Sequence, residues 1–201
     1  MELRTIRRVL AVYAHPDDEV VPCGATLAAL AGQGAEVTLL VLTRGEKGRS
    51  PGAGAGVVDL GSLRARELAA SAAALGIRDL RQWRFPDGGL SSAGPELRRR
   101  VAETLEEVGP DLVISHDPSG LYGHPDHVAT ALLVEELTRA AVPPARLWQV
   151  ALPRRLRRLL AASGALPREA ELPHPAAEPN LRVALSAQSR LAKARAWRAH
   201  R

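Results

Sequence analysis

Short apolar runs alternate with segments of helical periodicity along most of this chain, and this alternation restricts the fold more than any other feature. The expected strands are Arg8–Tyr13, Glu36–Leu42, Leu80–Phe85, Asp111–Ser115 and Leu147–Leu152. The expected helices between them are Ala25–Ala31, Ser62–Leu75, Pro95–Val108 and Val128–Ala141. Largely apolar strands separated by helices are typical of a parallel sheet that is buried on both faces. The sequence therefore predicts an α/β fold, Rossmann-like, with a mostly parallel sheet flanked by helices on both faces.

The composition is that of a globular domain. The chain has 201 residues, 46% of them hydrophobic and 24% charged, which is enough for one domain with a sizeable core. No apolar run is long enough to cross a bilayer, and the N-terminus shows no signal peptide. The single cysteine, Cys23, excludes an internal disulfide, fits a reducing compartment and is expected to be buried. We therefore expect a cytoplasmic protein without a membrane partner.

The net charge of +5 raises the question of an anionic partner. The basic residues, nearly all arginines, concentrate at positions 98–100, 154–158 and 190–201. Nucleic-acid binding favours basic residues interleaved with aromatic ones on one face, whereas the three Trp, two Tyr and one Phe are scattered along this chain. We interpret the basic runs as solvated helix faces and expect no nucleic-acid partner.

One imidazole and three carboxylates, in the run His15-Pro16-Asp17-Asp18-Glu19, follow the first apolar strand almost directly. Carboxylates this crowded repel one another unless a cation offsets their charge. Because two residues separate His15 from Asp18, an imidazole nitrogen and a carboxylate oxygen can reach one ion, and Zn²⁺ accepts this mixture of ligands. The run therefore indicates half of a metal site.

A second cluster, Gly123-His124-Pro125-Asp126-His127, repeats this chemistry after a later strand. Ligands of parallel sheets gather at the carboxyl ends of the strands, so both clusters are expected at one edge. A catalytic zinc site has three protein ligands and an open position for water. One of His124 and His127 should therefore bind the metal while the other faces the substrate, and spacing alone does not decide between them.

The remaining groups fit hydrolysis of an amide or ester. Asp17 adjoins a ligand without being needed as one, which suits a general base acting on metal-bound water. Asp126 could hydrogen-bond an imidazole and hold its tautomer, and a charged imidazolium would stabilise a tetrahedral oxyanion. His116 either supports the site or lines the pocket wall. Glu19 is left without a role other than a place at a helix N-terminus.

Both clusters resemble the signatures of the PIG-L/LmbE-like family of zinc-dependent N-acetylglucosamine deacetylases. The first signature matches Ala14–Glu19 and the second matches Tyr122–His127. Weaker similarity lies in Thr43–Gly48, Arg64–Leu68 and Phe85–Leu90. The resemblance extends in the family's order to about residue 152.

The resemblance implies a metal centre and a base. The metal would be Zn²⁺, and its ligands would be His15, Asp18 and His127. Asp17 would be the general base that activates the attacking water.

The resemblance also implies residues that face the substrate. His124, tuned by Asp126, would be the acid or the stabiliser of the oxyanion. Arg64 matches a substrate-binding arginine, and Tyr122 stands where some family members use a mobile tyrosine near the substrate carbonyl.

We therefore expect a zinc-dependent hydrolase that removes an N-acetyl group from an N-acetylglucosamine-type sugar conjugate. An amidase acting on a larger thiol–sugar conjugate is the alternative within the family. A non-haem iron enzyme with the same ligands is a more distant one. The expected partner is a small-molecule sugar conjugate. Assembly into a homo-oligomer is consistent with the family, whose members often form oligomers.

Three segments complete the prediction. The glycine-rich loop at 45–61 is expected to be a mobile lid or disordered, and 163–180 an irregular excursion between two elements. Lys193–Arg201 resembles the front of a late family motif in which a Lys and an Ala-rich helix precede His, a variable residue, Ser or Thr, and Gln. We expect residues 1–201 to form a single domain, and one interpretation is that this domain is truncated at its C-terminus.

Overall fold

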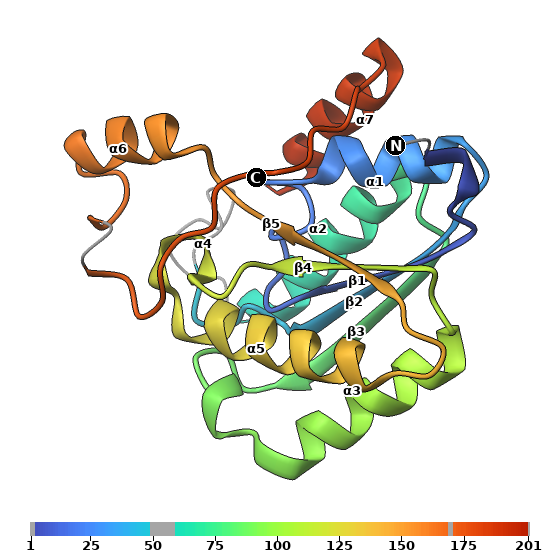
Figure 1. The fold of residues 1–201 in the computed structure, drawn as a ribbon, viewed down its shortest axis with the longest axis horizontal. Helices are drawn as coiled ribbons and strands as arrows, with labels where there is room; N and C mark the ends of the chain where they lie inside the picture. Colours follow the sequence, from blue (N-terminus) through green and yellow to red (C-terminus); the bar gives the residue numbers. More distant parts are fainter. Residues whose placement is uncertain (1–2, 49–58, 169–170, 201) are drawn as a thin grey trace.

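A computed structural model of the protein describes residues 3–48, 59–168 and 171–200. Within these ranges, five strands form one all-parallel sheet in the order β3-β2-β1-β4-β5 (Figure 1). The strands are β1 (Arg8–Tyr13), β2 (Glu36–Thr43), β3 (Asp79–Phe85), β4 (Leu112–His116) and β5 (Arg146–Val150). The parallel sheet confirms the predicted α/β class.

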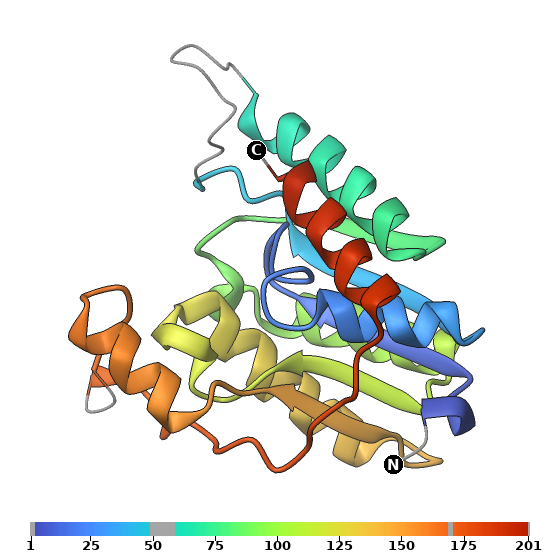
Figure 2. The same cartoon turned by 90° about the horizontal axis from the view of Figure 1, so that it is seen from above.

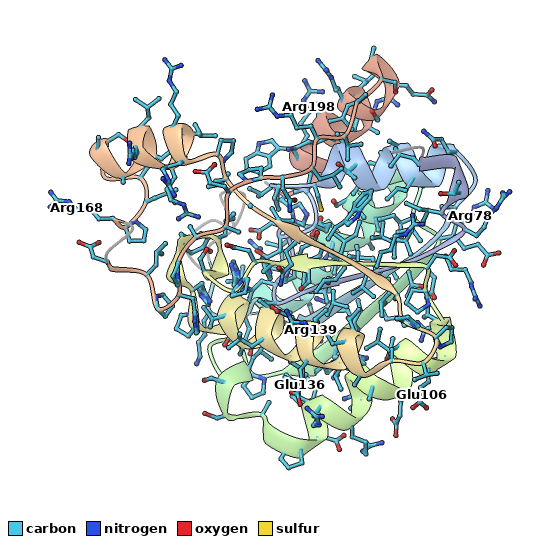
Figure 3. The ribbon with its side chains drawn as sticks, in the orientation of Figure 1. Arg78, Glu106, Glu136, Arg139, Arg168 and Arg198 are labelled. Atoms are coloured by element: carbon cyan, nitrogen blue, oxygen red, sulfur yellow. The ribbon has the colours of Figure 1, made fainter. Side chains whose placement is uncertain are left out.

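Helices cover both faces of the sheet (Figure 1). One face carries α1 (Gly24–Gly32), α2 (Leu60–Leu75) and α7 (Ala187–Ala199), and the other carries α3 (Gly94–Val108) and α5 (Pro125–Ala140). The remaining helices are α4 (Gly120–Gly123), α6 (Arg154–Ala162) and the 3-10 helices η1 (Leu3–Thr5) and η2 (Leu90–Ser92). Charged side chains such as Arg78, Glu106 and Arg168 lie at the periphery (Figure 3).

Strand β1 divides the core into two layers. Val9, Ala11 and Tyr13 belong to the layer beneath α1 and α2, whereas Leu10 and Val12 belong to the layer beneath α3 and α5. All five side chains are fully buried. Successive side chains of a strand point to opposite faces, so a strand covered on both faces must be apolar throughout. This is why the apolar runs predicted the strands well.

The helix ends follow local chemistry. Asp59 caps α2 by accepting a hydrogen bond from the backbone N–H of Ser62 at 2.9 Å. Gly76 closes the same helix with a φ of +78°, a left-handed conformation that glycine adopts without steric cost. The predicted strands and helices accordingly agree with the observed ones to within a few residues at each end.

Some segments outside this alternation are described by the structure, and others are not. Residues 49–58 of the glycine-rich loop, and with them the predicted lid, lie outside the described residues. The described part of 163–180 belongs to none of the helices and strands named above, as expected of an irregular excursion. Among the described helices, none is both long and apolar enough to span a membrane. Cys23 is buried, as predicted.

The strand order reverses at β1, which lies between β2 and β4. In open parallel sheets, ligands bind in the crevice outside the carboxyl ends of the strands at such a reversal. The first cluster begins two residues after the end of β1, and β4 ends at His116, a few residues before the second cluster. Topology therefore brings the two clusters to the place where a ligand is expected.

We expect replacement of Leu40, a fully buried residue of β2, to destabilise the fold. Leu40→Ala should lower the free energy of unfolding by about 2–5 kcal/mol, because transfer free energy is lost and a cavity remains. Urea denaturation followed by circular dichroism measures this change. Leu159→Ala on α6, where the side chain is 62% exposed, should change stability by about 0.5 kcal/mol or less. Equal losses in both variants would contradict the assigned core.

Candidate metal centre and active site

The second cluster forms the first turn of α5. Pro125 occupies the first position of this helix, where a fixed φ and a missing N–H are tolerated. His124 is the N-cap, and its Nδ1 accepts a hydrogen bond from the backbone N–H of Asp126 at 3.2 Å. The turn buries the side chains of Asp126 and His127 completely. The His-Pro-Asp-His run is thus the start of a helix that buries the side chains of Asp126 and His127.

The side chains of His15, Asp18 and His127 converge from the two clusters. His15 Nδ1 lies 3.2 Å from His127 Nε2 and 3.5 Å from Asp18 Oδ2. Asp18 Oδ1 lies 3.1 Å from His127 Nε2. Ligands held about 2.0–2.2 Å from a tetrahedral Zn²⁺ are separated from one another by about 3.3–3.6 Å. These three residues therefore have the spacing and the donor chemistry of ligands to one ion.

Neighbouring side chains extend this cluster. Among the described residues, three further sets of side chains could each hold an ion. Each set shares at least one residue with the convergent triad. They are His15 with His124 and His127, Asp18 with His116 and His127, and His15 with Asp87 and Asp126.

Each member of the triad is held by a second contact. The ring of His127 places Nδ1 at 3.2 Å from the carbonyl of Gly120, so Nδ1–H donates there and Nε2 faces the other ligands. The ring of His15 turns Nε2 to Asp126 Oδ2 at 3.1 Å and to Asp87 Oδ1 at 3.2 Å. Asp18 Oδ2 accepts the backbone N–H of His15 at 2.8 Å. These contacts orient the three candidate ligand atoms toward one point.

The electrostatics favour a positive charge in this cluster. Burial lowers the pKa of His15, but hydrogen bonds with Asp126, Asp18 and Asp87 outweigh burial and raise that pKa to about 11. Burial also opposes ionisation of Asp18, yet His127 and His116 hold its pKa well below the usual range. The carboxylates thus stay charged, and a cation among them is strongly stabilised.

Asp17 lies beside the triad in an unusual backbone conformation. Its φ is +99°, a left-handed value that a residue with a side chain rarely adopts. Its carboxylate is 40% exposed, and Oδ2 accepts a hydrogen bond from Arg64 Nη2 at 2.8 Å. Burial and repulsion from Asp18 raise the pKa of Asp17, while Arg64 opposes the rise. A carboxylate with a raised pKa is suited to accept a proton.

The structure shows which imidazole Asp126 contacts. Asp126 holds the ring of His15, as the sequence allowed for one of the imidazoles, whereas its implied tuning of His124 stays a prediction. Its two carboxylate oxygens also accept the backbone N–H groups of Gly88 at 2.7 Å and Leu90 at 3.0 Å. The physical reason is helix geometry, since the side chain of Asp126 points inward from the first turn while His124 stands outside it as the N-cap. Asp126 acts on His124 through its charge, which opposes the lowering of the pKa of His124 by its other surroundings.

His124 and Tyr122 border the triad. The His124 ring lies 4.8 Å from that of His15 and 4.7 Å from that of His127, centroid to centroid. Burial and these two imidazoles lower the pKa of His124 despite the opposing charge of Asp126. The Tyr122 ring packs edge-on against His127 at 5.1 Å and is 39% exposed. Both side chains are thus near the cluster, on a part of it that reaches solvent.

Arg64 contacts the loop that follows β1. The structure buries this side chain and directs Nη2 to the carboxylate of Asp17 and the carbonyl of Pro16, while the substrate contact implied by the resemblance stays a prediction. The cause is the position of Arg64 in the first turns of α2, next to the loop that follows β1. The guanidinium therefore holds the Asp17 carboxylate in place.

The sequence assigned no role to Asp87 and left two roles open for His116, and both residues lie near the candidate ligands. Asp87 lies in the family-like segment Phe85–Leu90, and it contacts His15. His116 stacks on His127 with centroids 4.0 Å apart, and its Nε2 lies 3.4 Å from Asp18 Oδ2. Because His116 is buried, it lies beneath the ligands rather than on an open pocket wall.

Comparison with known proteins identifies the family. The family model described as PIG-L, GlcNAc-PI de-N-acetylase, matches residues 10–138. This chain belongs to the PIG-L family. The match confirms the resemblance drawn from the two clusters.

The relatives of this PIG-L chain include deacetylases of sugar conjugates. It is 36% identical over 235 aligned positions to the 1D-myo-inositol 2-acetamido-2-deoxy-alpha-D-glucopyranoside deacetylase of Rhodococcus erythropolis, a match covering 96% of this chain and 80% of the relative. It is 40% identical over 147 positions to the protein of the same name from Thermobispora bispora, covering 61% and 48% of the two chains. Among solved structures, the A40926 pseudoaglycone deacetylase has a TM-score of 0.67 at 25% identity, covering 96% of this chain and 81% of that one.

Several curated relatives are longer than this PIG-L chain. The chain spans 80% of the Rhodococcus protein but 42% to 64% of the others compared. The names of these relatives describe removal of an acetyl group from an N-acetylglucosaminyl-inositol conjugate. This is the class of reaction that the sequence predicted for the family.

The geometry predicts which side chains bind a divalent ion. His15→Ala, Asp18→Ala and His127→Ala should each reduce the bound metal to well below one equivalent, since each removes a candidate ligand. Plasma mass spectrometry of the purified variants measures the metal content. His174→Ala, in the segment between α6 and α7, is the matched histidine control and should keep the wild-type content. Full metal occupancy in all three site variants would contradict the assigned ligands.

Proposed function

We propose that this protein is a Zn²⁺-dependent hydrolase that removes the acetyl group from an N-acetylglucosamine-type sugar conjugate. One observation carries the proposal: His15, Asp18 and His127 converge with the spacing of three metal ligands, next to the carboxylate of Asp17. Family membership and the deacetylase relatives support the choice of an N-acetyl group as the target.

A bound Zn²⁺ would supply a Lewis acid and a water whose pKa is lowered toward about 7. His15, Asp18 and His127 would hold the ion. The ring contacts of His15 with Asp126 and of His127 with Gly120 keep their other nitrogens aimed at it.

Asp17 would take the proton of the attacking water. Its carboxylate lies beside the ligand Asp18 and is partly open to solvent, so a water can reach it. Burial and the neighbouring carboxylate raise its pKa toward the pH of the reaction, which favours proton transfer. Arg64 would restrict the carboxylate to one orientation through its 2.8 Å hydrogen bond.

His124 would act on the carbonyl and on the leaving amine. Its protonated ring would stabilise the negative charge that develops on the carbonyl oxygen, and it would then give a proton to the amine. Because burial and two neighbouring imidazoles lower the pKa of His124, its protonated form gives up a proton more readily than an ordinary imidazolium does. Tyr122, on the exposed side of His124, would contact the substrate near the same carbonyl.

The inositol conjugate named for the curated relatives is the first substrate to test. An amidase acting on a larger thiol–sugar conjugate is the alternative, and the same assay with that conjugate distinguishes the two. Two histidines and one carboxylate also suit non-haem iron, so metal analysis belongs beside the assay. We also predict that residues 1–201 form one domain, that the protein is cytoplasmic and that it assembles into a homo-oligomer.

Asp17→Ala should abolish most turnover and leave the metal bound. We expect the rate of acetate release from the inositol conjugate to fall by about 10²–10⁴-fold, since a general base is lost while the ligands remain. The rate and the metal content are measured on the same preparation. Glu106→Ala removes an exposed carboxylate from α3 and should retain the wild-type rate (Figure 3). Near-normal turnover by Asp17→Ala would exclude Asp17 as the base.

Removal of the metal should stop the reaction reversibly. Dialysis against a chelator is expected to abolish acetate release, and added Zn²⁺ should restore it because the ligand set remains intact. Recovery with Fe²⁺ under anaerobic conditions but not with Zn²⁺ would favour the iron alternative. Turnover that persists at undetectable metal content would rule out a metal-dependent mechanism.

A further inference from the structure

Glu19 is a fully buried carboxylate that the mechanism above does not use. The sequence suggested a place at a helix N-terminus, but α1 begins only at Gly24, so this expectation is wrong. Its Oε2 accepts the backbone N–H of Asp17 at 2.9 Å. Its Oε1 accepts the hydroxyl of Ser71 at 2.5 Å and lies 2.8 Å from His200 Nε2. Glu19 therefore joins the loop after β1 to α2 and to the end of α7.

The burial of Glu19 requires these donors. A carboxylate removed from water is costly unless hydrogen bonds replace its hydration. The three donors come from three separate segments, and one of them is 181 residues away along the chain. The carboxylate is consequently stable only while α2 and α7 are in place.

Asp17 requires a support of this kind. A left-handed φ in a residue with a side chain persists only where the surrounding contacts over-determine it. Glu19 holds the backbone N–H of Asp17, and Arg64 holds its carboxylate together with the carbonyl of Pro16. One residue holds the backbone of Asp17 and the other holds its carboxylate, so together they define where the carboxylate points.

Helix α7 is fixed at the edge where Asp17 lies. It packs against α1 and α2, and its C-terminal end lies beside the N-terminal end of α2 (Figure 2). Ala196 is buried in the core, and Lys193 Nζ donates to the carbonyl of Val21 at 2.7 Å. The side chain of His200 is only 5% exposed, and its Nδ1 lies 3.9 Å from Glu67 Oε2. The imidazole is therefore held in position and not merely close to Glu19.

We propose that Glu19 and His200 are positioning residues for the base. His200 donates from Nε2 to Glu19, and Glu19 in turn holds the N–H of Asp17, so that the Asp17 carboxylate is directed at the metal centre. This inference rests on the function proposed for Asp17. It makes the last turn of α7 necessary for turnover, although the candidate metal ligands come from the loops after β1 and β4.

The test compares His200→Ala with His200→Gln. The alanine variant should lower kcat by between about 10-fold and 100-fold, the size of effect that a small displacement of a reacting group produces, with KM and metal content unchanged. The glutamine variant should recover most of kcat, because its amide Nε2 can donate to Glu19 where the imidazole Nε2 does. Arg198→Ala changes an exposed side chain two residues earlier and should behave like the wild type (Figure 3).

Amide hydrogen exchange measured by NMR gives a readout that does not depend on activity. His200→Ala should accelerate exchange at the Asp17 amide, while the buried amide of Leu10 in β1 keeps its protection. His200→Gln should restore the slow exchange at Asp17.

Two results would overturn the proposal. One is wild-type kcat and wild-type Asp17 exchange in His200→Ala. The other is an equal loss in the alanine and glutamine variants together with faster exchange at Leu10, because α7 would then serve stability alone. If the wild-type enzyme releases no acetate, the proposed function fails, and exchange at Asp17 still decides whether His200 and Glu19 hold its backbone.

Discussion

The crowding of carboxylates at the carboxyl ends of β1, β3 and β4 is the constraint on which the rest of this site depends. Asp17, Asp18, Glu19, Asp87 and Asp126 lie within contact of one another or of shared imidazoles, and several of them are buried. Negative charge at this density is stable only with cations and hydrogen-bond donors around it. The structure supplies the imidazoles of the metal centre, the guanidinium of Arg64, backbone N–H groups and the ring of His200. The same charge would favour a divalent metal beside these imidazoles.

The sheet makes this crowding possible. Its strand order reverses at β1, so the loops after β1 and β4 emerge side by side although about a hundred residues separate them. Apolar layers on both faces hold β1 rigidly, and a rigid strand end positions short loops more precisely than a long flexible connection would. The buried apolar strand β1 therefore lies directly before the charged loop that carries His15, Asp17 and Asp18. Helix α7 extends this support, since it packs on α1 and α2 and reaches the same edge with its last turn.

Much of this was predictable because it is local. The strands follow from apolar runs, the end of α2 from Gly76, the start of α3 from Pro95, and the candidate ligands from two short clusters. The contacts that were not predicted join distant segments. Arg64 pairs with Asp17, and Asp126 holds His15. Asp87 received no role from the sequence because its importance lies in a contact with a residue 72 positions earlier.

The sequence by itself determined the parallel α/β fold, the residue types of the candidate metal centre and the family. These properties depend on periodicity and on motifs a few residues long, and such patterns can be recognised in the sequence alone. Only the tertiary structure decided which carboxylate contacts which imidazole and how Asp17 is held at a φ of +99°. It alone also showed that Glu19 connects Asp17 to His200, 181 residues further along the chain. The physical reason is that a buried charge takes whichever donors the packing of helices brings within about 3 Å, and that packing is not encoded in any single segment.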